Sequence, residues 1–176
     1  MQNIYSVIAL LDTESRTYLS TIMRCLPTTG LIGEHIEPHI TIAVYEKNPD
    51  TAGLIAWTEQ VAARQKAFKL RYDLIGIFLS GSLVAVPSFS SELWQLYSNH
   101  HERFGDYCRD WGIHKSDVWL PHTGLCYTDR ESAKAMMPKL ADLFEPFVAE
   151  VVALRISEYD GKDFNAVAEF ALKSYT

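Results

Sequence analysis

The chain has 176 residues, of which 48% are hydrophobic and 22% are charged, as in an ordinary globular protein with one buried core. Its formal net charge of −6 argues against a protein that coats duplex nucleic acid, which needs a basic face, but allows a nucleotide or an RNA terminus as a small substrate. No apolar run is long enough for a membrane helix, and the first ten residues lack the basic leader and cleavage site of a signal peptide, so we expect a cytoplasmic protein without a membrane partner.

The cysteines predict free thiols. Cys25, Cys108 and Cys126 are odd in number and widely spaced, and they form no C-x-x-C pair, so neither a disulfide framework nor a zinc site is expected. Cys126 is predicted to share a strand face with His122, but a cysteine nucleophile would need neighbours that stabilise a thiolate, and the sequence identifies none.

Hydrophobic periodicity and capping residues predict alternating strands and helices. In the first half we expect a strand over residues 4–11, a helix from Asp12 or Thr13 to about Cys25, a strand that begins at His39, and a helix from Asp50 or Thr51 to about Lys66. Strands over 68–79 and 83–86, joined by a hairpin, complete the first half. In the second half we expect a helix over about 90–111, a strand at His122, a helix over 132–143, and strands over 147–159 and 164–172. Pro138 is expected to bend or break its helix.

The order of these elements repeats. Each half of the chain runs through a helix, a strand that opens with a histidine, a second helix, and two strands joined by a turn. No linker or low-complexity tract separates the halves. The sequence therefore predicts a single α+β domain over residues 1–176, made of two similar lobes.

The strand at His39 carries the first candidate site. Because side chains alternate along a strand, His39, Thr41 and Tyr45 are predicted to share one face, while the apolar residues at 40, 42 and 44 face the core. Side chains two residues apart lie about 6–7 Å from each other and can reach one ligand. Histidine exchanges a proton near neutral pH, and a hydroxyl can hydrogen-bond an anionic oxygen. Tyr45 is predicted to line the same cleft, with a purely packing role as the alternative.

The Pro-His opening of this strand occurs a second time, at Pro121-His122. The two histidines are 122 − 39 = 83 residues apart, close to half the chain. A single histidine at the mouth of an apolar strand is more often structural, so the pairing carries the prediction. Two histidines presented alike by related half-chains suggest an acid and a base that face each other.

His39-Ile40-Thr41-Ile42 and His122-Thr123-Gly124-Leu125 resemble the paired His-x-Thr/Ser-x motifs of the two-histidine (2H) phosphoesterases, a family that includes the bacterial 2′-5′ RNA ligase-like proteins and cyclic nucleotide phosphodiesterases. The resemblance implies a bilobal fold, with two pseudo-symmetric lobes of antiparallel sheet and helices packed outside around a central cleft. It also implies that His39 and His122 are the general acid and base and that Thr41 holds a phosphate oxygen. Such chemistry requires no metal and no cofactor.

The second motif departs from the family pattern, because Gly124 stands where a Ser or Thr hydroxyl is expected. Thr123 is adjacent, but alternation aims it at the opposite face unless a bulge re-aims it. The backbone N–H of Gly124, or a water molecule, is the other way to hold a phosphate there. Loss of one hydrogen bond to a charged group weakens binding by roughly 1.5–3 kcal/mol.

His35 and His39 have a metal-ligand spacing if the segment is helical. Pro38 disfavours a helix at this point, and no suitable third ligand follows nearby. We therefore interpret His35 as a loop residue at the edge of the cleft and expect no metal.

Two functions are compatible with these motifs. The first is a metal-independent phosphodiesterase that hydrolyses 2′,3′-cyclic or 2′-5′-linked ribonucleotide phosphates. The second is a nucleotide- or RNA-end-binding protein whose second motif has degenerated at Gly124 and that turns over little or no substrate. A scaffold without a ligand would leave both histidines dispensable. A monomer is the expected oligomeric state.

Overall fold

The computed structural model describes residues 4–27, 36–46, 49–108, 119–159 and 164–174, and the statements below refer to these residues. Its strands are β1 (Ile4–Leu11), β2 (His39–Tyr45), β3 (Phe68–Ile77), β4 (Leu83–Pro87), β5 (Thr123–Cys126), β6 (Phe147–Tyr159) and β7 (Phe164–Ala171). Its helices are α1 (Thr13–Cys25), α2 (Thr51–Ala62), α3 (Ser91–Phe104), which continues into a 3-10 turn at Gly105–Tyr107, and α4 (Arg130–Leu143).

The predicted elements are present, but several of their ends differ. The helix predicted to about Lys66 ends at Ala62, the strand predicted over 68–79 ends at Ile77, and the strand predicted at His122 begins at Thr123. The helix predicted over residues 90–111 ends as an α-helix at Phe104, where Gly105, a poor helix former, follows. Residues 109–111 lie outside the described part. Pro138 lies inside α4, which continues to Leu143, so of the two outcomes predicted for this proline the broken helix does not occur.

The strands form one antiparallel sheet that joins the two lobes. The strand order is β2-β1-β6-β3-β4-β5, and β7 also pairs with β6. The long strand β6 makes the connection, because its residues 147–151 pair with β3 while residues 151–159 pair with β1. The predicted α+β, two-lobed architecture is therefore confirmed.

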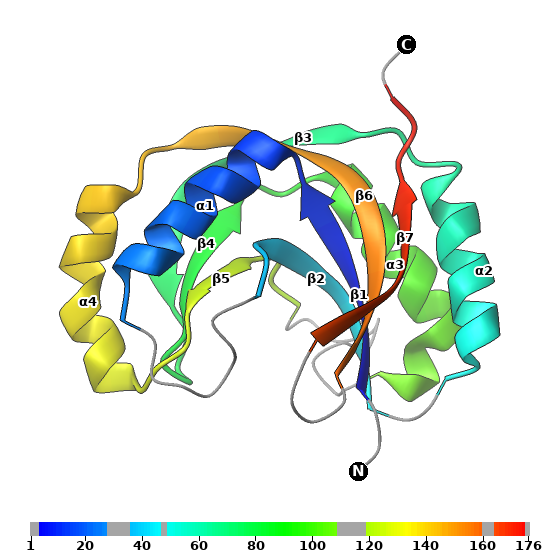
Figure 1. Ribbon diagram of the computed structural model, residues 1–176, viewed down its shortest axis with the longest axis horizontal. Helices are drawn as coiled ribbons and strands as arrows, with labels where there is room; N and C mark the ends of the chain where they lie inside the picture. Colours follow the sequence, from blue (N-terminus) through cyan, green and yellow to red (C-terminus); the bar gives the residue numbers. More distant parts are fainter. Residues whose placement is uncertain (1–3, 28–35, 47–48, 109–118, 160–163, 175–176) are drawn as a thin grey trace.

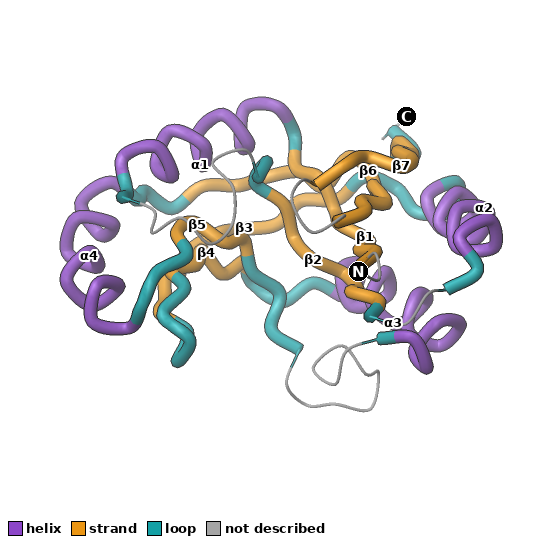
Figure 2. The backbone as a smooth tube through the Cα atoms, turned by 60° about the horizontal axis from the view of Figure 1, so that its bottom comes forward, coloured by secondary structure: helices purple, strands orange, loops and turns teal. Residues whose placement is uncertain are grey.

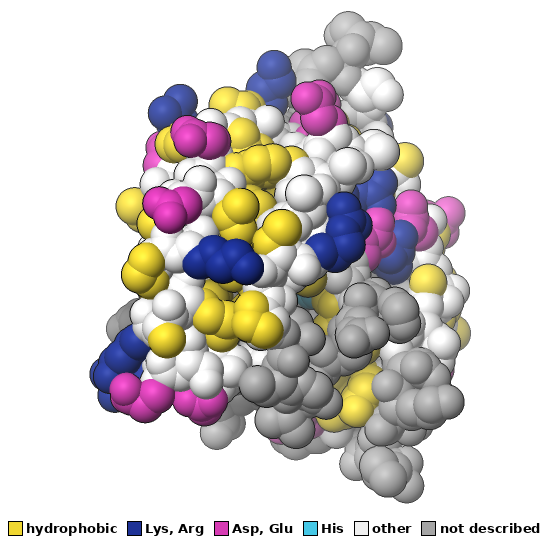
Figure 3. Space-filling model, turned by 60° about the vertical axis from the view of Figure 1, so that its left-hand side comes forward, with side chains coloured by type: hydrophobic (Ala, Val, Ile, Leu, Met, Phe, Trp, Pro, Cys, Tyr) yellow, Lys and Arg dark blue, Asp and Glu magenta, His cyan; other side chains and the backbone are white. Residues whose placement is uncertain are grey.

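The helices cover the sheet at its two ends. α1 and α4 contact β5 and β3 at one end, and α2 and α3 contact β6, β7 and β2 at the other (Figures 1 and 2). β2 and β5 contact each other between these ends. On the α4 side, Lys and Arg side chains are scattered among hydrophobic and acidic ones (Figure 3). No helix in the described ranges is long and apolar enough to cross a membrane.

Aspartates begin the two helices that cover β3 and β5. The carboxylate of Asp12 accepts the backbone N–H of Ser15 at 2.9 Å and that of Glu150 at 2.7 Å, which fastens the start of α1 to β6. Asp129 accepts the backbone N–H of Ser132 at 2.9 Å at the start of α4. Such N-caps each stabilise a helix by about 1 kcal/mol. The sheet is thus fixed to its helices next to the strands that carry the candidate site.

One hydrophobic core extends through both lobes. It includes Leu19 of α1, Ile40 of β2, Leu83 of β4, Leu125 of β5 and Leu154 of β6, all fully buried. Burial of each such side chain stabilises the fold by about 1.5–3 kcal/mol. β2 and β5 therefore have one face fixed against the core, which leaves the opposite face for the site.

Candidate active site

β2 contains a bulge three residues after His39. Thr41 pairs with Ile8, but Ala43 pairs with the preceding residue Val7, so Ile42 is an extra residue on β2. Ile42 and Ala43 are consequently both buried, and the alternation of faces shifts by one residue beyond them. His39 and Thr41 lie before the bulge and share a half-buried face.

β5 contains a bulge at the same place relative to its histidine. Gly124 pairs with Val84, but Cys126 pairs with the preceding residue Leu83, so Leu125 is the extra residue. Leu125 and Cys126 are both buried, as are their counterparts in β2. The two histidine strands thus agree in their irregularity as well as in sequence. We call the half-buried faces of β2 and β5 that carry His39, Thr41, His122 and Gly124 the site face.

The bulge in β2 overturns the prediction for Tyr45. Beyond Ile42 the faces exchange, so Tyr45 turns into the core and is fully buried, and its ring lies edge-on to Phe104 at 6.2 Å between centroids. Val44, predicted to face the core, takes the half-buried position instead. Tyr45 therefore does not line the site face and has the packing role.

Thr123 is buried and does not belong to the site face. It lies before the bulge in β5, so ordinary alternation turns it away from Gly124, and its side chain is fully buried. Its hydroxyl forms a 2.9 Å hydrogen bond with the hydroxyl of Tyr72 on β3. A phosphate on the site face is out of reach of this hydroxyl.

The two imidazoles are held in the same way. Nδ1 of His39 lies 2.7 Å from the carbonyl oxygen of Glu37, and Nδ1 of His122 lies 2.8 Å from the carbonyl oxygen of Leu120. In both cases the partner is two residues upstream, across the proline. A carbonyl only accepts, so Nδ1 carries the proton in each ring and Nε2 of the neutral imidazole is left as the proton acceptor.

The structure brings the two motifs next to each other. The indole Nε1 of Trp119, three residues before His122, donates to the backbone carbonyl of Thr41 at 3.4 Å. The imidazoles also interact electrostatically: burial, the nearby His122 and the guanidinium of Arg155 together lower the pKa of His39 to about 4. Burial lowers the pKa of His122 as well. Both shifts favour the neutral form of the imidazole.

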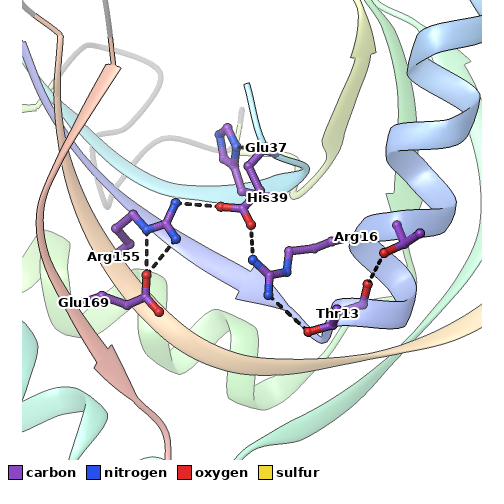
Figure 4. Close-up of polar contacts among 7 residues, drawn as sticks. Thr13, Arg16, Glu37, His39, Arg155 and Glu169 are labelled. Carbon is purple, nitrogen blue, oxygen red and sulfur yellow. Dashed lines mark hydrogen bonds and ion pairs between the residues drawn. The ribbon is translucent and has the colours of Figure 1, made fainter. Parts of the chain in front are cut away.

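An ion-pair chain lies beside His39 and includes Glu37, whose carbonyl holds the imidazole. The carboxylate of Glu37 lies between the guanidinium groups of Arg16 and Arg155, and Arg155 also contacts Glu169 at 2.7 Å (Figure 4). The Arg155–Glu37 contact is 2.6 Å. Because the carbonyl of the same Glu37 accepts from His39, the chain fixes the residue that orients the ring. These contacts join α1, β6 and β7, and sequence analysis missed their role because the partners are far apart in the chain.

Aromatic side chains border the histidines. The ring of Phe78 lies edge-on to His122 with 4.6 Å between centroids. Trp119 stacks on Tyr97 at 4.2 Å, and Trp94 stacks on the same Tyr97 at 5.2 Å. Trp94 is 40% exposed. Trp94 and Tyr97 belong to α3, so the stacked rings connect Trp119, next to the second histidine, with this helix.

Neither a metal site nor a cysteine nucleophile is found among the described residues. His35 lies outside the described residues. Within the described ranges, no three His, Cys, Asp or Glu side chains gather where a metal ion would bind. Cys126 is a buried free thiol that donates to the carbonyl of Pro27, and burial raises its pKa, which disfavours a thiolate nucleophile.

The fold and the paired histidine strands define a two-lobed protein of the 2H kind. Residues 27–163 match the model of the 2′-5′ RNA ligase superfamily, and the chain therefore belongs to this superfamily of 2H phosphoesterases. No curated protein matches the sequence.

Several solved structures share the fold. A phosphoesterase has a TM-score of 0.67 at 14% identity, with 98% of this chain and 99% of the other covered. LigT of E. coli complexed with 3′-AMP has a TM-score of 0.64 at 15% identity, with 98% and 99% covered. LigT complexed with phosphate has a TM-score of 0.60 at 16% identity, with 96% of each chain covered. At these identities the similarity establishes the fold.

Proposed function

We propose that this protein is a metal-independent phosphodiesterase that opens 2′,3′-cyclic or 2′-5′-linked ribonucleotide phosphates, with His39 and His122 as general base and acid. The observation that carries the proposal is the matched pair of imidazoles. Both are held through Nδ1 by an upstream carbonyl, and they are close enough for one to lower the pKa of the other. Membership of the 2H phosphoesterase superfamily supports the same reaction class.

The chemistry needs one group on each side of phosphorus. A neutral imidazole removes a proton from the attacking water through Nε2, while a protonated imidazole gives its Nε2 proton to the leaving ribose oxygen. The phosphate diester is an anion, so its arrival favours protonation of an imidazole beside it. Thr41 donates its hydroxyl hydrogen to a non-bridging oxygen and keeps the phosphate oriented for in-line attack.

We assign the base role in hydrolysis to His39. Burial, His122 and Arg155 lower the pKa of His39 to about 4, so the ring is neutral at the pH at which a base is needed. His122 lies farther towards solvent beside Phe78 and takes the acid role. In the reverse direction the two roles exchange.

The ligand class is a small phosphorylated ribonucleotide or an RNA terminus. E. coli LigT, which has the same fold, was crystallised with phosphate and with 3′-AMP, and similar ligands fit a site built around two imidazoles and a hydroxyl. The net charge of −6 is consistent with a short ligand rather than an extended duplex.

The test is hydrolysis of adenosine 2′,3′-cyclic phosphate in excess chelator by the wild type, His39→Ala and His122→Ala. We expect the wild type to be active with chelator present and each substitution to abolish turnover, with far-UV circular dichroism and the melting temperature recorded to show that each variant is folded. Turnover that survives both substitutions would eliminate the mechanism.

A second candidate function is ligand binding without turnover, and the observation that favours it is Gly124 in the second motif. In that case calorimetry would detect binding of 3′-AMP by the wild type while no cyclic phosphate is opened. Loss of the same binding in His39→Ala would show that the site is used, but for recognition only.

A further inference from the structure

The second motif lacks a hydroxyl at position 124, but the hydroxyl of another residue lies beside this position. A Cβ atom built on Gly124 would lie 2.3 Å from the phenol oxygen of Tyr127 and 2.8 Å from its Cζ. These distances are too short for a real Cβ, so the phenol excludes any side chain at position 124 and places its own oxygen next to the glycine.

The bulge in β5 is what directs Tyr127 to this place. In a regular strand, residues 124 and 127 point to opposite faces. The extra residue Leu125 shifts the alternation, so Leu125 and Cys126 are both buried and Tyr127 returns, half-buried, to the side of Gly124. The close approach of the phenol oxygen to Gly124 is the direct evidence of this exchange of faces.

The first lobe gives the matching comparison. In β2 the hydroxyl stands two residues after the histidine, at Thr41, and the apolar Val44 stands five residues after it. In the second lobe Gly124 stands two residues after the histidine and Tyr127 five residues after it. The bulges lie between these positions in both strands. The second lobe thus has its hydroxyl five residues after the histidine, directly beyond β5, where the first lobe has it two residues after the histidine.

We infer that Tyr127 is the second phosphate-binding hydroxyl of this site, the counterpart of Thr41 across the bound phosphate. This inference rests on the proposed function and completes it. A phenol both donates and accepts hydrogen bonds, so that of Tyr127 is suited to donate to a non-bridging phosphate oxygen when the ligand binds. Burial raises the pKa of Tyr127, so the group keeps the hydrogen it donates across the physiological pH range.

The test compares four proteins: the wild type, Tyr127→Phe, Tyr45→Phe and the double variant Gly124→Ser/Tyr127→Ala. Tyr127→Phe removes only the oxygen. Tyr45→Phe is the matched control, because it removes a fully buried hydroxyl that has no hydrogen-bond partner among the described residues. The double variant clears the phenol and returns a hydroxyl to position 124, as in the family pattern. The measurements are kcat/KM for adenosine 2′,3′-cyclic phosphate, the inhibition constant of inorganic phosphate, and the melting temperature.

We expect Tyr127→Phe to lower kcat/KM and to weaken inhibition by phosphate, each by roughly 10- to 100-fold, as for loss of one hydrogen bond to a charged group. Tyr45→Phe should have the kinetic constants of the wild type. The double variant should recover most of the kcat/KM and phosphate inhibition that Tyr127→Phe loses, although alanine replaces the phenol ring at position 127. A merely structural role for Tyr127 would change the melting temperature without this recovery.

The outcomes separate the two proposals. Histidine-dependent hydrolysis with unchanged kinetic constants in Tyr127→Phe would overturn the role of Tyr127 and leave the proposed function standing. A wild type that neither opens the cyclic phosphate nor binds inorganic phosphate would overturn the proposed function and this inference with it. Loss in Tyr127→Phe that the double variant recovers would support both.

Discussion

Replacement of Glu37 by Gln tests whether the ion-pair chain positions His39. The substitution keeps the size of the side chain and the backbone carbonyl that accepts from Nδ1 of His39, but it removes the charge that Arg16 and Arg155 share. Both guanidinium groups then lose a carboxylate, and among the described residues Arg155 alone retains another, that of Glu169. We expect the protein to lose stability and the imidazole of His39 to lose part of its proton affinity.

The burial of the three side chains sets the magnitude of the stability change. Their exposed fractions are 34% for Glu37, 25% for Arg16 and 21% for Arg155, between surface and interior. Exposed ion pairs contribute about 0–1 kcal/mol, and breaking a buried pair costs about 3–5 kcal/mol. We therefore expect a loss of about 2 kcal/mol. For a chain of this length that corresponds to a decrease of roughly 4–8 °C in the melting temperature.

The effect on catalysis has a definite sign. Removal of a negative charge beside His39, together with a less neutralised Arg155, lowers the pKa of His39 further. The acidic limb of the kcat/KM profile, which reports protonation of the base in the free enzyme, should move to lower pH. Looser anchoring of the carbonyl of Glu37 should also lower the plateau of the profile, by roughly tenfold.

Glu169→Gln is the control for this experiment. It removes the more exposed partner of Arg155, with an exposed fraction of 49%, and leaves Glu37 and its contact with Arg16 in place. We expect a change below about 1 kcal/mol in stability and a plateau near that of the wild type. If urea denaturation and the pH profile showed the same small effects for both substitutions, the view that Glu37 positions His39 would be refuted.

Three further predictions follow from single contacts. Burial lowers the pKa of His100 from 6.5 to about 4, so the unfolded protein binds a proton in this pH range that the folded protein does not. The free energy of unfolding should therefore decrease as the pH falls from 6.5 to 4, by up to about 1.4 kcal/mol per pH unit. Urea denaturation of the wild type and of His100→Gln measures this dependence, and the same slope in both proteins would contradict the prediction. Thr41→Val should weaken inhibition by inorganic phosphate by roughly 10- to 100-fold at an unchanged melting temperature, and an unchanged inhibition constant would exclude Thr41 from the site. Gly124→Ala should lower kcat/KM about as much as Tyr127→Phe, because the added Cβ displaces the phenol of Tyr127. Gly105→Ala is the control and should leave kcat/KM unchanged, because its Cβ meets nothing within 4 Å. The same kcat/KM in the two glycine variants would contradict the steric argument.

Much of the fold could be predicted from local sequence. The continuous apolar residues of β1, the caps Asp12 and Asp129, and the Pro-His openings at positions 39 and 122 are short-range signals, and the elements they predict are present. The face of each histidine strand could also be predicted up to the third residue, because alternation depends only on a regular backbone.

The side-chain faces beyond the two bulges could not be predicted from the sequence. A bulge is defined by the partner strand, since Ile42 is extra only relative to β1 and Leu125 only relative to β4. Beyond it every side chain exchanges faces, so regular alternation predicts the wrong face for Tyr45 and gives no indication that Tyr127 lies beside Gly124. The ion-pair chain was hidden for a similar reason, because Glu37 meets Arg155 from 118 positions away.

Steric considerations decide between a degenerated and a rearranged second motif. Glycine in a strand costs roughly 0.5–1 kcal/mol relative to alanine, and Gly124 has no positive φ that would require it. If the strand had lost its hydroxyl with no other change, alanine or a β-branched residue at this position would make it more stable than glycine does. The phenol oxygen of Tyr127 takes the space of the Cβ, so glycine at 124 and tyrosine at 127 form one feature. The second lobe thus keeps its histidine, the carbonyl partner of that histidine and its bulge, and it has a phenol oxygen beside Gly124, as the proposed rearrangement of the motif requires.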